Sequence, residues 1–343
     1  MNSQRVTAEM VARHAGTSVS TVSLVVNGKD RGRVSAGLRD RVRAAVAELG
    51  YVVDQTASAL ARGRGDLVIL FVPDPGNPFF AEVVRGARQV LDGRYRLLVA
   101  TTRHGDQPTV DDVADHTSFR PAGMLIDAPV SGFMSSLPPE GLAPAVLLDA
   151  PDCPGSVNFD LQPGIRALVE HLAAAGHRRF GYLDTRAEVA TYDVRRRLLR
   201  ETAAAAGLTM MPRVARAEVT VASAAREVGQ QLPDWLAEGA TAVVAATDTM
   251  AYGVLAAARA AGLDVPGRLA VAGFDDLPTS AVTGPPLTSV ALSGSELGRR
   301  SATRLLAAID GSPTAAATSI GTELVVREST AARVAPTSAA VVG

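Results

Sequence analysis

The chain has 343 residues, a formal net charge of −1, one cysteine and 47% hydrophobic residues. This length is enough for two or three domains with cores of their own. A single cysteine excludes an intramolecular disulfide and a thiolate metal cluster. No apolar run reaches the roughly 18 residues of a membrane helix, and the first residues lack the apolar stretch of a secretory signal. We therefore expect a cytoplasmic protein without membrane contact.

Charge is distributed unevenly along the chain. Residues 1–65 contain ten Lys or Arg and five Asp or Glu, a net charge of +5, which leaves −6 for the remainder. A basic segment ahead of an acidic body is typical of a chain whose first part binds a polyanion. A solvated arginine-rich surface is the alternative interpretation of the same charge.

The first residues predict two short helices joined by a glycine turn. Thr7 is placed to cap a helix that runs to about His14, and Gly16 allows the turn that ends it. Ser18 is placed to cap a second helix, which ends at the dipeptide 27–28. This arrangement is a helix-turn-helix. A third helix, with Ser35 as its expected cap, follows and completes a small bundle.

The second helix begins with the small residues Val19, Ser20 and Thr21. A helix that enters the major groove of DNA presents its leading end to the base edges, where hydroxyls can donate or accept and methyls can contact thymine. Small residues also begin helices in ordinary bundles, so this pattern gains weight from the charge.

Residues 51–65 predict a linker with one or two helical turns, which are marginal in isolation. Leu60 has no core to enter, and apolar side chains of this kind can wedge between base steps in the minor groove. A plain linker is the alternative. Arg31, Arg33, Arg39 and Arg43 are expected to contact phosphates. The candidate DNA-binding residues are Thr7, Ser18, Val19, Ser20, Thr21, Ser23, Asn27, Arg31, Arg33, Ala57 and Leu60.

From Asp66 onward, apolar runs of strand length alternate with helical segments. The runs are 67–73, 95–102, 123–129, 145–151, 179–185, 241–248 and 269–276, and the helical segments include 78–92, 163–176, 187–206, 249–262 and 295–310. This alternation predicts parallel sheets with helices on both faces. The strands are too many for one sheet around a single core, so we expect an α/β body of two lobes with a cleft.

Ligands of such sheets bind beyond the carboxyl ends of the strands. The polar residues expected there are Asp74, Asn77, Asp149, Thr185, Thr247, Asp248, Asp275 and Asp276. An aspartate in this position often only caps the next helix. Hydrolase, metalloprotease and phosphate-loop motifs are absent from the sequence, and the five histidines show no metal-ligand spacing. We therefore expect no enzyme, no cofactor and no metal.

Several segments carry a resemblance to a known family. They are VTAEMVARHAGTSVSTVSLVVNG near the start and, in the body, PDPGNPFFAEVVRGA, GFDDLP, PPLTSV and ELVVREST. In this order they resemble the lactose/galactose-repressor (LacI/GalR) family of bacterial transcription regulators. The resemblance implies an α/β protein with an N-terminal helix-turn-helix head and a two-lobed, periplasmic-binding-protein-like core of parallel sheets flanked by helices. It also implies a homodimer.

The resemblance sets domain boundaries, with three crossings between the lobes. The expected parts are a DNA-binding domain at 1–50, a hinge at 51–65, a core at 66–330 and a tail at 331–343. Within the core, lobe 1 is expected at about 66–160 and 288–318, and lobe 2 at about 161–287 and 319–330. The tail shows no heptad pattern, so a dimer is expected rather than a tetramer.

Site residues follow from the matching positions. The resemblance places Val19, Ser20 and Thr21 at base-reading positions and Leu60 at the hinge wedge. Arg195 matches an arginine that grips polar ligand groups. The candidate effector-binding residues are Asn77, Phe79, Phe80, Asp149, Phe159, Thr191, Arg195, Thr247, Asp248 and Asp275.

The chain departs from the family pattern at several positions. Leu24 stands where an arginine usually reads guanine, which removes a contact worth ~1–3 kcal/mol of discrimination. Residues 195–197 are all arginine, so the register of the gripping arginine is open by one. Residues 214–224 contain no aromatic side chain, so ring stacking on a ligand is expected from one side only.

These observations favour a DNA-binding transcriptional regulator, of repressor type, that binds a near-palindromic double-stranded operator as a dimer. Its effector is expected to be a small molecule, a sugar or sugar derivative, in the cleft between the lobes. Two alternatives remain open at this stage. One is a repressor that depends on a purine-type corepressor, and the other is a sugar-binding protein without a DNA role.

Overall fold

The computed structural model describes residues 6–26, 28–51, 65–102, 107–130, 132–136, 143–151, 153, 155–312 and 318–331. The chain divides into two compact units, Met1–Gly65 and Asp66–Gly343, called the head and the core below. The candidate residues Asn27, Ala57 and Leu60 lie outside the described residues, as does nearly all of the tail.

The described residues of the head form three helices, α1 (Ala8–His14), α2 (Val19–Val26) and α3 (Ala36–Leu49). The Thr7 hydroxyl accepts a hydrogen bond from the Met10 amide at 3.3 Å, as predicted for an N-cap. Ser35 has the backbone conformation of an N-cap, but its side chain makes no cap hydrogen bond, contrary to expectation. The small core that joins the helices consists of Val11, Ala12, Ala15, Val22, Val25, Val42 and Ala45.

The core contains two sheets. The first has the order β12-β5-β4-β3-β1-β2, and its neighbouring strands pair in parallel. Its strands are β1 (Leu67–Val72), β2 (Arg96–Thr101), β3 (Gly123–Asp127), β4 (Ala145–Leu148), β5 (Val157–Asp160) and β12 (Thr318–Gly321). Its helices are α5 (Pro78–Leu91), α6 (Val110–His116), α7 (Phe133–Ser136) and α12 (Gly294–Ile309), with a 3₁₀ turn at Thr117–Phe119. Together they form lobe 1.

The second sheet has the order β13-β11-β10-β9-β6-β7, with β8 also paired to β6. Its strands are β6 (Arg179–Thr185), β7 (Thr209–Met210), β8 (Ala215–Ala217), β9 (Ala242–Ala245), β10 (Ala270–Asp275), β11 (Thr288–Ala291) and β13 (Glu323–Val325). Only β13, of the strands described, pairs antiparallel. The helices of this lobe 2 are α8 (Gln162–Ala174), α9 (Ala190–Ala205), α10 (Val221–Ala237) and α11 (Asp248–Ala260), with 3₁₀ turns η2 (Pro278–Ala281) and η3 (Glu328–Thr330).

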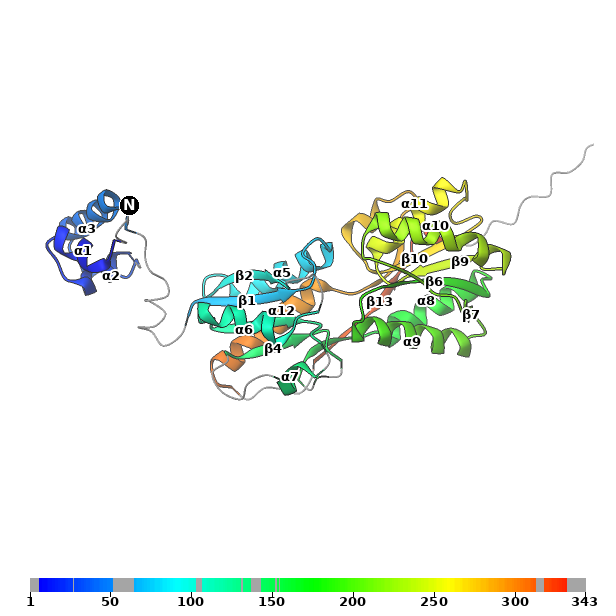
Figure 1. Ribbon diagram of the computed structural model, residues 1–343, viewed down its shortest axis with the longest axis horizontal. Helices are drawn as coiled ribbons and strands as arrows, with labels where there is room; N and C mark the ends of the chain where they lie inside the picture. The colour runs from blue at the N-terminus through cyan, green and yellow to red at the C-terminus, as the bar shows by residue number, and fades with distance from the viewer. Residues whose placement is uncertain are drawn as a thin grey trace, which may run out of the picture. The chain divides into compact units, whose positions relative to one another are not determined.

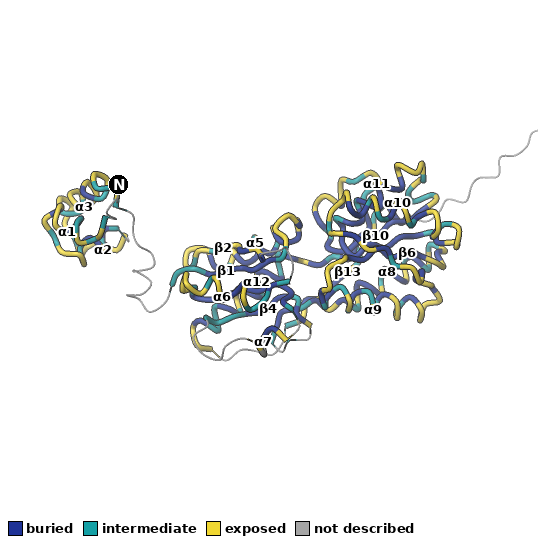
Figure 2. The backbone as a smooth tube through the Cα atoms, in the orientation of Figure 1, coloured by how far each residue is buried: buried dark blue, intermediate teal, exposed yellow. Residues whose placement is uncertain are grey.

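Strand β1 illustrates how the apolar runs build the layers. Successive strand side chains point to opposite faces. Leu70 therefore joins the cluster that contains α5 and α12, whereas Phe71 joins the cluster that contains α6 and α7. A run that is apolar at every position is buried on both faces, and Figure 2 shows these strands in the buried colour. In lobe 2, Figure 1 shows α10 and α11 on one face of the sheet and α8 and α9 on the other.

Glycine allows α5 and α12 to approach closely. A Cβ atom on Gly86 would lie 1.8 Å from the Ser295 carbonyl oxygen, and one on Gly298 would lie 2.0 Å from the Val83 carbonyl oxygen. Any side chain at either position would therefore force the two helices apart.

The strand memberships correct the expected lobe boundaries. Residues 288–291, expected in lobe 1, form β11 of the second sheet, and residues 319–321, expected in lobe 2, belong to β12 of the first. The three crossings therefore fall between β5 and α8, between β11 and α12, and between β12 and β13. Strands of four residues carry too little pattern to fix a boundary to the residue. None of the helices within the described ranges is long and apolar enough to cross a membrane.

Candidate functional site

Helix α2 of the head has one buried face and one exposed face. Val22 and Val25 are buried against α1 and α3, whereas Val19 is 46% exposed and Ser20 is also exposed. The Ser18 hydroxyl accepts a hydrogen bond from the Thr21 amide at 3.3 Å, which satisfies a free donor of the first turn. The exposed leading edge is therefore small, polar in part and fixed by a cap.

The arginines of the head differ in what they contact. Arg31 and Arg33 lie exposed in the turn between α2 and α3. Arg39, which was expected to contact phosphate, instead forms an ion pair with the buried carboxylate of Asp30. That pair holds the turn on α3, so Arg39 has a structural contact, and its expected contact with phosphate stays a prediction.

The core contains a cavity of about 470 Å³ that is lined from both lobes. It lies where five strands end, because its lining includes the residues that end or follow β1, β3, β4, β6 and β10. These residues are Asp74, Asp127, Asp149, Thr185 and Asp275. The placement agrees with the general position of ligand sites in parallel sheets.

Seven of the ten candidate effector residues line this cavity. They are Asn77, Phe79, Phe80, Asp149, Thr191, Arg195 and Asp275. Asn77 caps α5, since its side chain accepts a hydrogen bond from the Phe79 amide at 3.1 Å. This cap fixes the start of the helix from which the two phenylalanines face the cavity.

The other three candidates lie outside the lining. Phe159 packs edge-on against Phe79, with 6.3 Å between ring centroids, and so supports a lining residue. Thr247 caps α11 by accepting a hydrogen bond from the Met250 amide at 3.2 Å. Asp248 is fully buried within lobe 2.

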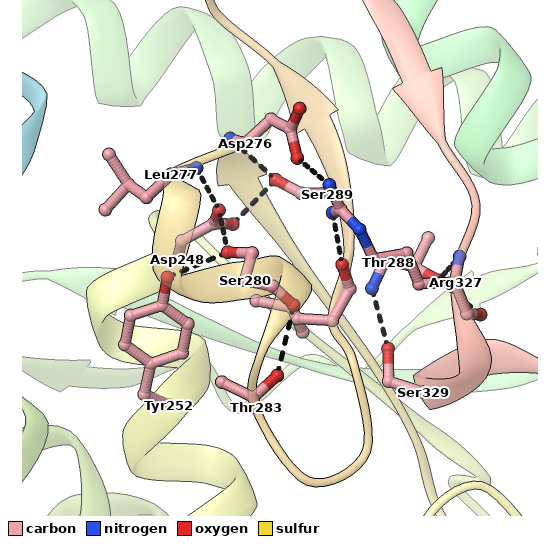
Figure 3. Close-up of polar contacts among 11 residues, drawn as sticks. Asp248, Tyr252, Asp276, Leu277, Ser280, Thr283, Thr288, Ser289, Arg327 and Ser329 are labelled. Carbon is pink, nitrogen blue, oxygen red and sulfur yellow. Dashed lines mark hydrogen bonds and ion pairs between the residues drawn. The ribbon is translucent and has the colours of Figure 1, made fainter. Parts of the chain in front are cut away.

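Asp248 is occupied by donors from distant parts of the chain, as Figure 3 shows. Its Oδ2 accepts hydrogen bonds from the Leu277 amide at 2.9 Å and the Ser280 hydroxyl at 2.5 Å. Its Oδ1 accepts from the Ser289 hydroxyl at 2.6 Å. Burial raises the pKa of Asp248 to about 7, against the lowering effect of these bonds. The carboxyl joins α11, η2 and β11, and a contact with an effector is not its role in this structure.

Arg195 is the cation at the centre of the cavity. Its guanidinium carbon lies 5.2 Å from the ring centroid of Tyr192 and 4.8 Å from that of Phe274. It donates a hydrogen bond to the Ala246 carbonyl oxygen, and its Nε has no hydrogen-bond partner. The neighbouring Arg196 instead pairs with Asp184 and another acid on α9. Of the three consecutive arginines, Arg195 is therefore the one directed to the cavity.

Three aspartates at strand ends line the interior of the same cavity, of which Asp127 and Asp275 are buried and Asp149 is partly buried. Burial raises the pKa of Asp127 and of Asp275 well above the usual range. Burial also raises the pKa of Asp149, while the Arg195 charge and a hydrogen bond from Thr191 act against it. Asp127 Oδ1 and Asp275 Oδ2 have no hydrogen-bond partner. Buried polar atoms normally have partners, and those that lack one indicate a ligand or a functional role.

The backbone is strained at the same strand ends. Ala128, Asp149, Asp275 and Asp276 have φ values of 36°, 45°, 111° and 54°. Such conformations cost non-glycine residues of order 1–3 kcal/mol each and concentrate at functional sites. At these residues the chain turns sharply at the ends of β3, β4 and β10, beside the cavity.

Among the lining residues that the sequence candidates omit, Asp127 and Tyr192 carry groups that can contact a ligand. Asp127 ends β3 in the pattern GMLIDAP, which matches the pattern AVLLDAP around Asp149, so the signal was present. Tyr192 adjoins the candidate Thr191 on α9. Tyr192 belongs to lobe 2, whereas Phe79 and Phe80 belong to lobe 1. Aromatic side chains therefore line the cavity from both lobes. The expectation that ring stacking on a ligand comes from one side only stays a prediction.

Comparison with known proteins shows the family to which the chain belongs. A model of the lacI family of bacterial regulatory proteins matches residues 9–54, and a model of a periplasmic binding protein-like domain matches residues 169–330. The HTH-type transcriptional regulator GntR of Pseudomonas aeruginosa is 31% identical over 343 residues, which cover 95% of this chain and 96% of the relative. The chain belongs to the lacI family. It is a DNA-binding transcriptional regulator and not an enzyme.

Other relatives of this lacI-family chain agree. The HTH-type transcriptional regulator CelR of Thermobifida fusca is 32% identical over 352 residues, covering 95% of this chain and 98% of the relative. The lac repressor dimer bound to operator and the anti-inducer ONPF matches with a TM-score of 0.77 at 27% identity, covering 95% and 99% of the two chains. A complex of the regulator CelR with cellobiose matches with a TM-score of 0.68 at 30% identity, covering 95% and 100%. The predicted fold class is thereby confirmed.

Proposed function

We propose that this regulator is a cytoplasmic repressor that binds a near-palindromic operator as a homodimer and is released by a small polyhydroxylated effector in the core cavity. The observation that carries the proposal is the cavity itself. It combines buried, partly unpaired polar groups with aromatic rings from both lobes. Hydroxyl-rich ligands need such polar groups for their hydroxyls and rings for their C–H faces.

The surface of α2 supports the DNA-binding half of the proposal. Val19 and Ser20 are exposed at the leading edge of the helix, and Arg31 and Arg33 are exposed in the following turn. We propose that the helix edge contacts bases and that the two arginines contact phosphates. Leu24 brings no hydrogen-bonding group, so the operator differs from those that an arginine at that position reads.

Strand β2 supports the dimer. It is an edge strand of the first sheet, and Leu98 and Val99 are each 38% exposed on it. Exposed apolar residues on an edge strand are normally covered. We propose that a second copy of the chain covers them. The similar lac repressor structure is described as a dimer bound to operator.

An effector in the cavity touches both lobes at once, because Asp149 and Phe79 come from lobe 1 and Arg195 and Asp275 from lobe 2. It therefore stabilises one arrangement of the lobes over another. A ligand shifts an equilibrium only through such differential contacts. The similar CelR structure is a complex with cellobiose, which supports a sugar as the effector class.

The proposal is tested by fluorescence anisotropy with operators selected from random duplexes. The parent protein should select a near-palindrome, and its affinity should fall steeply with salt. The double variant Arg31→Ala/Arg33→Ala should bind more weakly and show a salt slope smaller by about two, since each contact releases roughly one counterion. Arg166→Ala, an exposed arginine on α8 of the core, is the matched control and should change neither.

The effector half is tested by adding sugars, sugar derivatives and the purines guanine and hypoxanthine to the preformed complex. Release of DNA by a sugar supports the proposal. Failure to select any duplex over random competitor would refute the DNA-binding half. Tighter DNA binding with a purine, and no response to any sugar, would refute the effector half.

A further inference from the structure

The buried charges of the cavity do not balance. Among the lining residues that the structure describes, Asp127 and Asp275 are buried acids, Asp149 is a partly buried acid, and Arg195 is the one buried cation. The other arginine of the lining, Arg186, is half exposed and pairs with Glu227 at 2.9 Å and with a lining glutamate at 4.0 Å. With all carboxyls ionised, the buried part of the cavity would therefore hold two negative charges without partners.

The excess is located at the lobe 1 side of the cavity. Asp127 ends β3 and Asp149 follows β4, the neighbouring strand, so both residues lie at the same edge of the sheet and both line the cavity. The Asp149 charge adds to burial in raising the pKa of Asp127. Asp149 has a hydrogen bond from Thr191 and the attraction of Arg195, whereas Asp127 Oδ1 has no hydrogen-bond partner.

This pair of acids does not stabilise the unliganded protein. A buried carboxyl without donors costs free energy unless it keeps its proton. A neutral side chain at position 127 would avoid that cost in the unliganded protein. A ligand with a positive charge reverses the balance, because it supplies the missing counter-ion in a site that excludes water. An anionic ligand would add a third uncompensated charge.

We propose that the effector of this regulator carries a protonated amine on a polyhydroxylated frame, as amino sugars do, and that the amine is held between Asp127 and Asp149. Arg195 and Asp275 then serve the hydroxyls from lobe 2, and Phe79 and Phe80 contact the carbon frame. This inference rests on the cavity being the effector site. The volume of about 470 Å³ suits a ligand of one or two sugar rings.

The test measures binding to the full-length protein by isothermal titration calorimetry. Each probe is used in three forms that keep the pyranose ring and differ in one charged substituent: an amino sugar, its neutral parent sugar and the corresponding uronate. D-glucosamine, D-glucose and D-glucuronate form one such set, and the galactose and mannose sets are made in the same way. In at least one set the amine should bind more than about tenfold tighter than the neutral sugar, a difference of ~1.4 kcal/mol. The acids should not bind.

The substitution Asp127→Asn removes the charge of the carboxyl while it keeps the shape of the side chain. It should weaken binding of the amine by about tenfold or more and leave or improve binding of the neutral sugar. Asp111→Asn is the matched control, since Asp111 is an exposed aspartate in the first turn of α6 in lobe 1 and does not line the cavity. It should change neither affinity by more than about twofold.

Binding of the amine should also release protons, because the carboxyls must ionise to hold it. The affinity for the amine should therefore rise with pH above the usual titration range of aspartate, since burial raises the pKa of Asp127, and the heat of binding should depend on the ionisation enthalpy of the buffer. The titratable or charged groups that face Asp127 are Asp149 from the end of β4, Tyr192 and Arg195 from α9, and Asp275 from the end of β10.

The outcomes separate this inference from the proposed function. If a neutral sugar or a sugar acid binds as tightly as its amine and releases DNA, the proposal of an amine-bearing effector is wrong, whereas the proposed repressor function stands. The same proposal is wrong if the Asp127→Asn variant binds the amine with the affinity of the parent protein. If no probe of any charge binds, both proposals fall.

Discussion

Asp248 and Asp275 show how two similar carboxyls of one lobe can have different roles. Both follow neighbouring strands of the second sheet, β9 and β10, and both are buried. Asp248 accepts three hydrogen bonds from Leu277, Ser280 and Ser289. Asp275 lines the cavity and leaves Oδ2 without a partner. The number of internal donors, rather than position or burial, distinguishes an acid that holds the fold from one that awaits a ligand.

The difference has an energetic origin. A carboxyl whose donors are all internal is satisfied before any ligand arrives, and removing it leaves the donors buried and unpaired. A carboxyl without donors is a cost to the unliganded protein, and removing it relieves that cost. Substitutions at the two positions should therefore act on different properties of the molecule.

The largest effect on stability is expected at Asp248. Asp248→Ala leaves two hydroxyls and one amide without their acceptor and opens a small cavity between α11 and η2. At ~1–3 kcal/mol for each unpaired group, the free energy of unfolding should fall by on the order of 3 kcal/mol or more. Urea denaturation followed by the fluorescence of Trp235, the single tryptophan, measures this, because Trp235 is buried in lobe 2. A loss below about 1 kcal/mol would remove the structural role from Asp248.

Asp275→Asn should act on the effector instead. The isosteric amide removes the charge that faces Arg195, so the effector that releases DNA should bind about tenfold more weakly. The free energy of unfolding should change by less than ~1 kcal/mol, because asparagine keeps a side-chain oxygen that can accept the hydrogen bond from the Asp248 backbone. Asparagine also tolerates the positive φ of 111° better than most side chains. Equal loss of stability at Asp275 and Asp248 would contradict the distinction between them.

The sequence predicts the fold well where the elements are long and buried. Strands β1 and β3 appear as apolar runs because both of their faces are covered. The short strands β7, β8 and β13 have two or three residues each, too few for any periodicity, and they were missed. Helix α10 was missed too, since its internal Pro233 is usually a mark of a helix end.

The site was predictable only as far as topology determines it. Asp149 and Asp275 were found because parallel strands bring their carboxyl ends to one edge. Asp248 has the same local pattern, but the hydroxyls that satisfy it come from Ser280 and Ser289, 32 and 41 residues later in the chain. No local pattern shows such partners. The unpaired state of Asp127 Oδ1 is hidden for the same reason, because it depends on what all other segments fail to supply.

The pH dependence of stability tests the comparison by another route. In the folded protein the pKa of Asp248 is about 7, against about 4 in an unfolded chain. Between these values the folded state keeps a proton that the unfolded state has lost, so this group makes stability fall as the pH rises. Relative to Asp248→Asn, the parent should lose at most about 1.4 kcal/mol per pH unit in this window. Urea denaturation of both proteins at several pH values gives the difference, and parallel curves would refute it.

The smallest effect on stability is expected at Tyr252, whose hydroxyl is hydrogen bonded to Ser280 rather than to the Asp248 carboxyl. Tyr252 on α11 and Ser280 are hydrogen bonded through their hydroxyls at 2.8 Å, and Ser280 in turn donates to Asp248 (Figure 3). Tyr252→Phe removes only the outer hydroxyl. Asp248 keeps all three of its donors, so the free energy of unfolding should fall by about 1 kcal/mol, the value of one hydrogen bond.

Effector and DNA affinities should stay the same in Tyr252→Phe, because Tyr252 does not line the cavity. The same urea denaturation and calorimetry measure both properties. A loss as large as that of Asp248→Ala would mean that the tyrosine, rather than the number of donors around the carboxyl, holds η2 on α11. A changed effector affinity would mean that the cavity and the Asp248 contacts form one unit, and the division between the two acids would then fail.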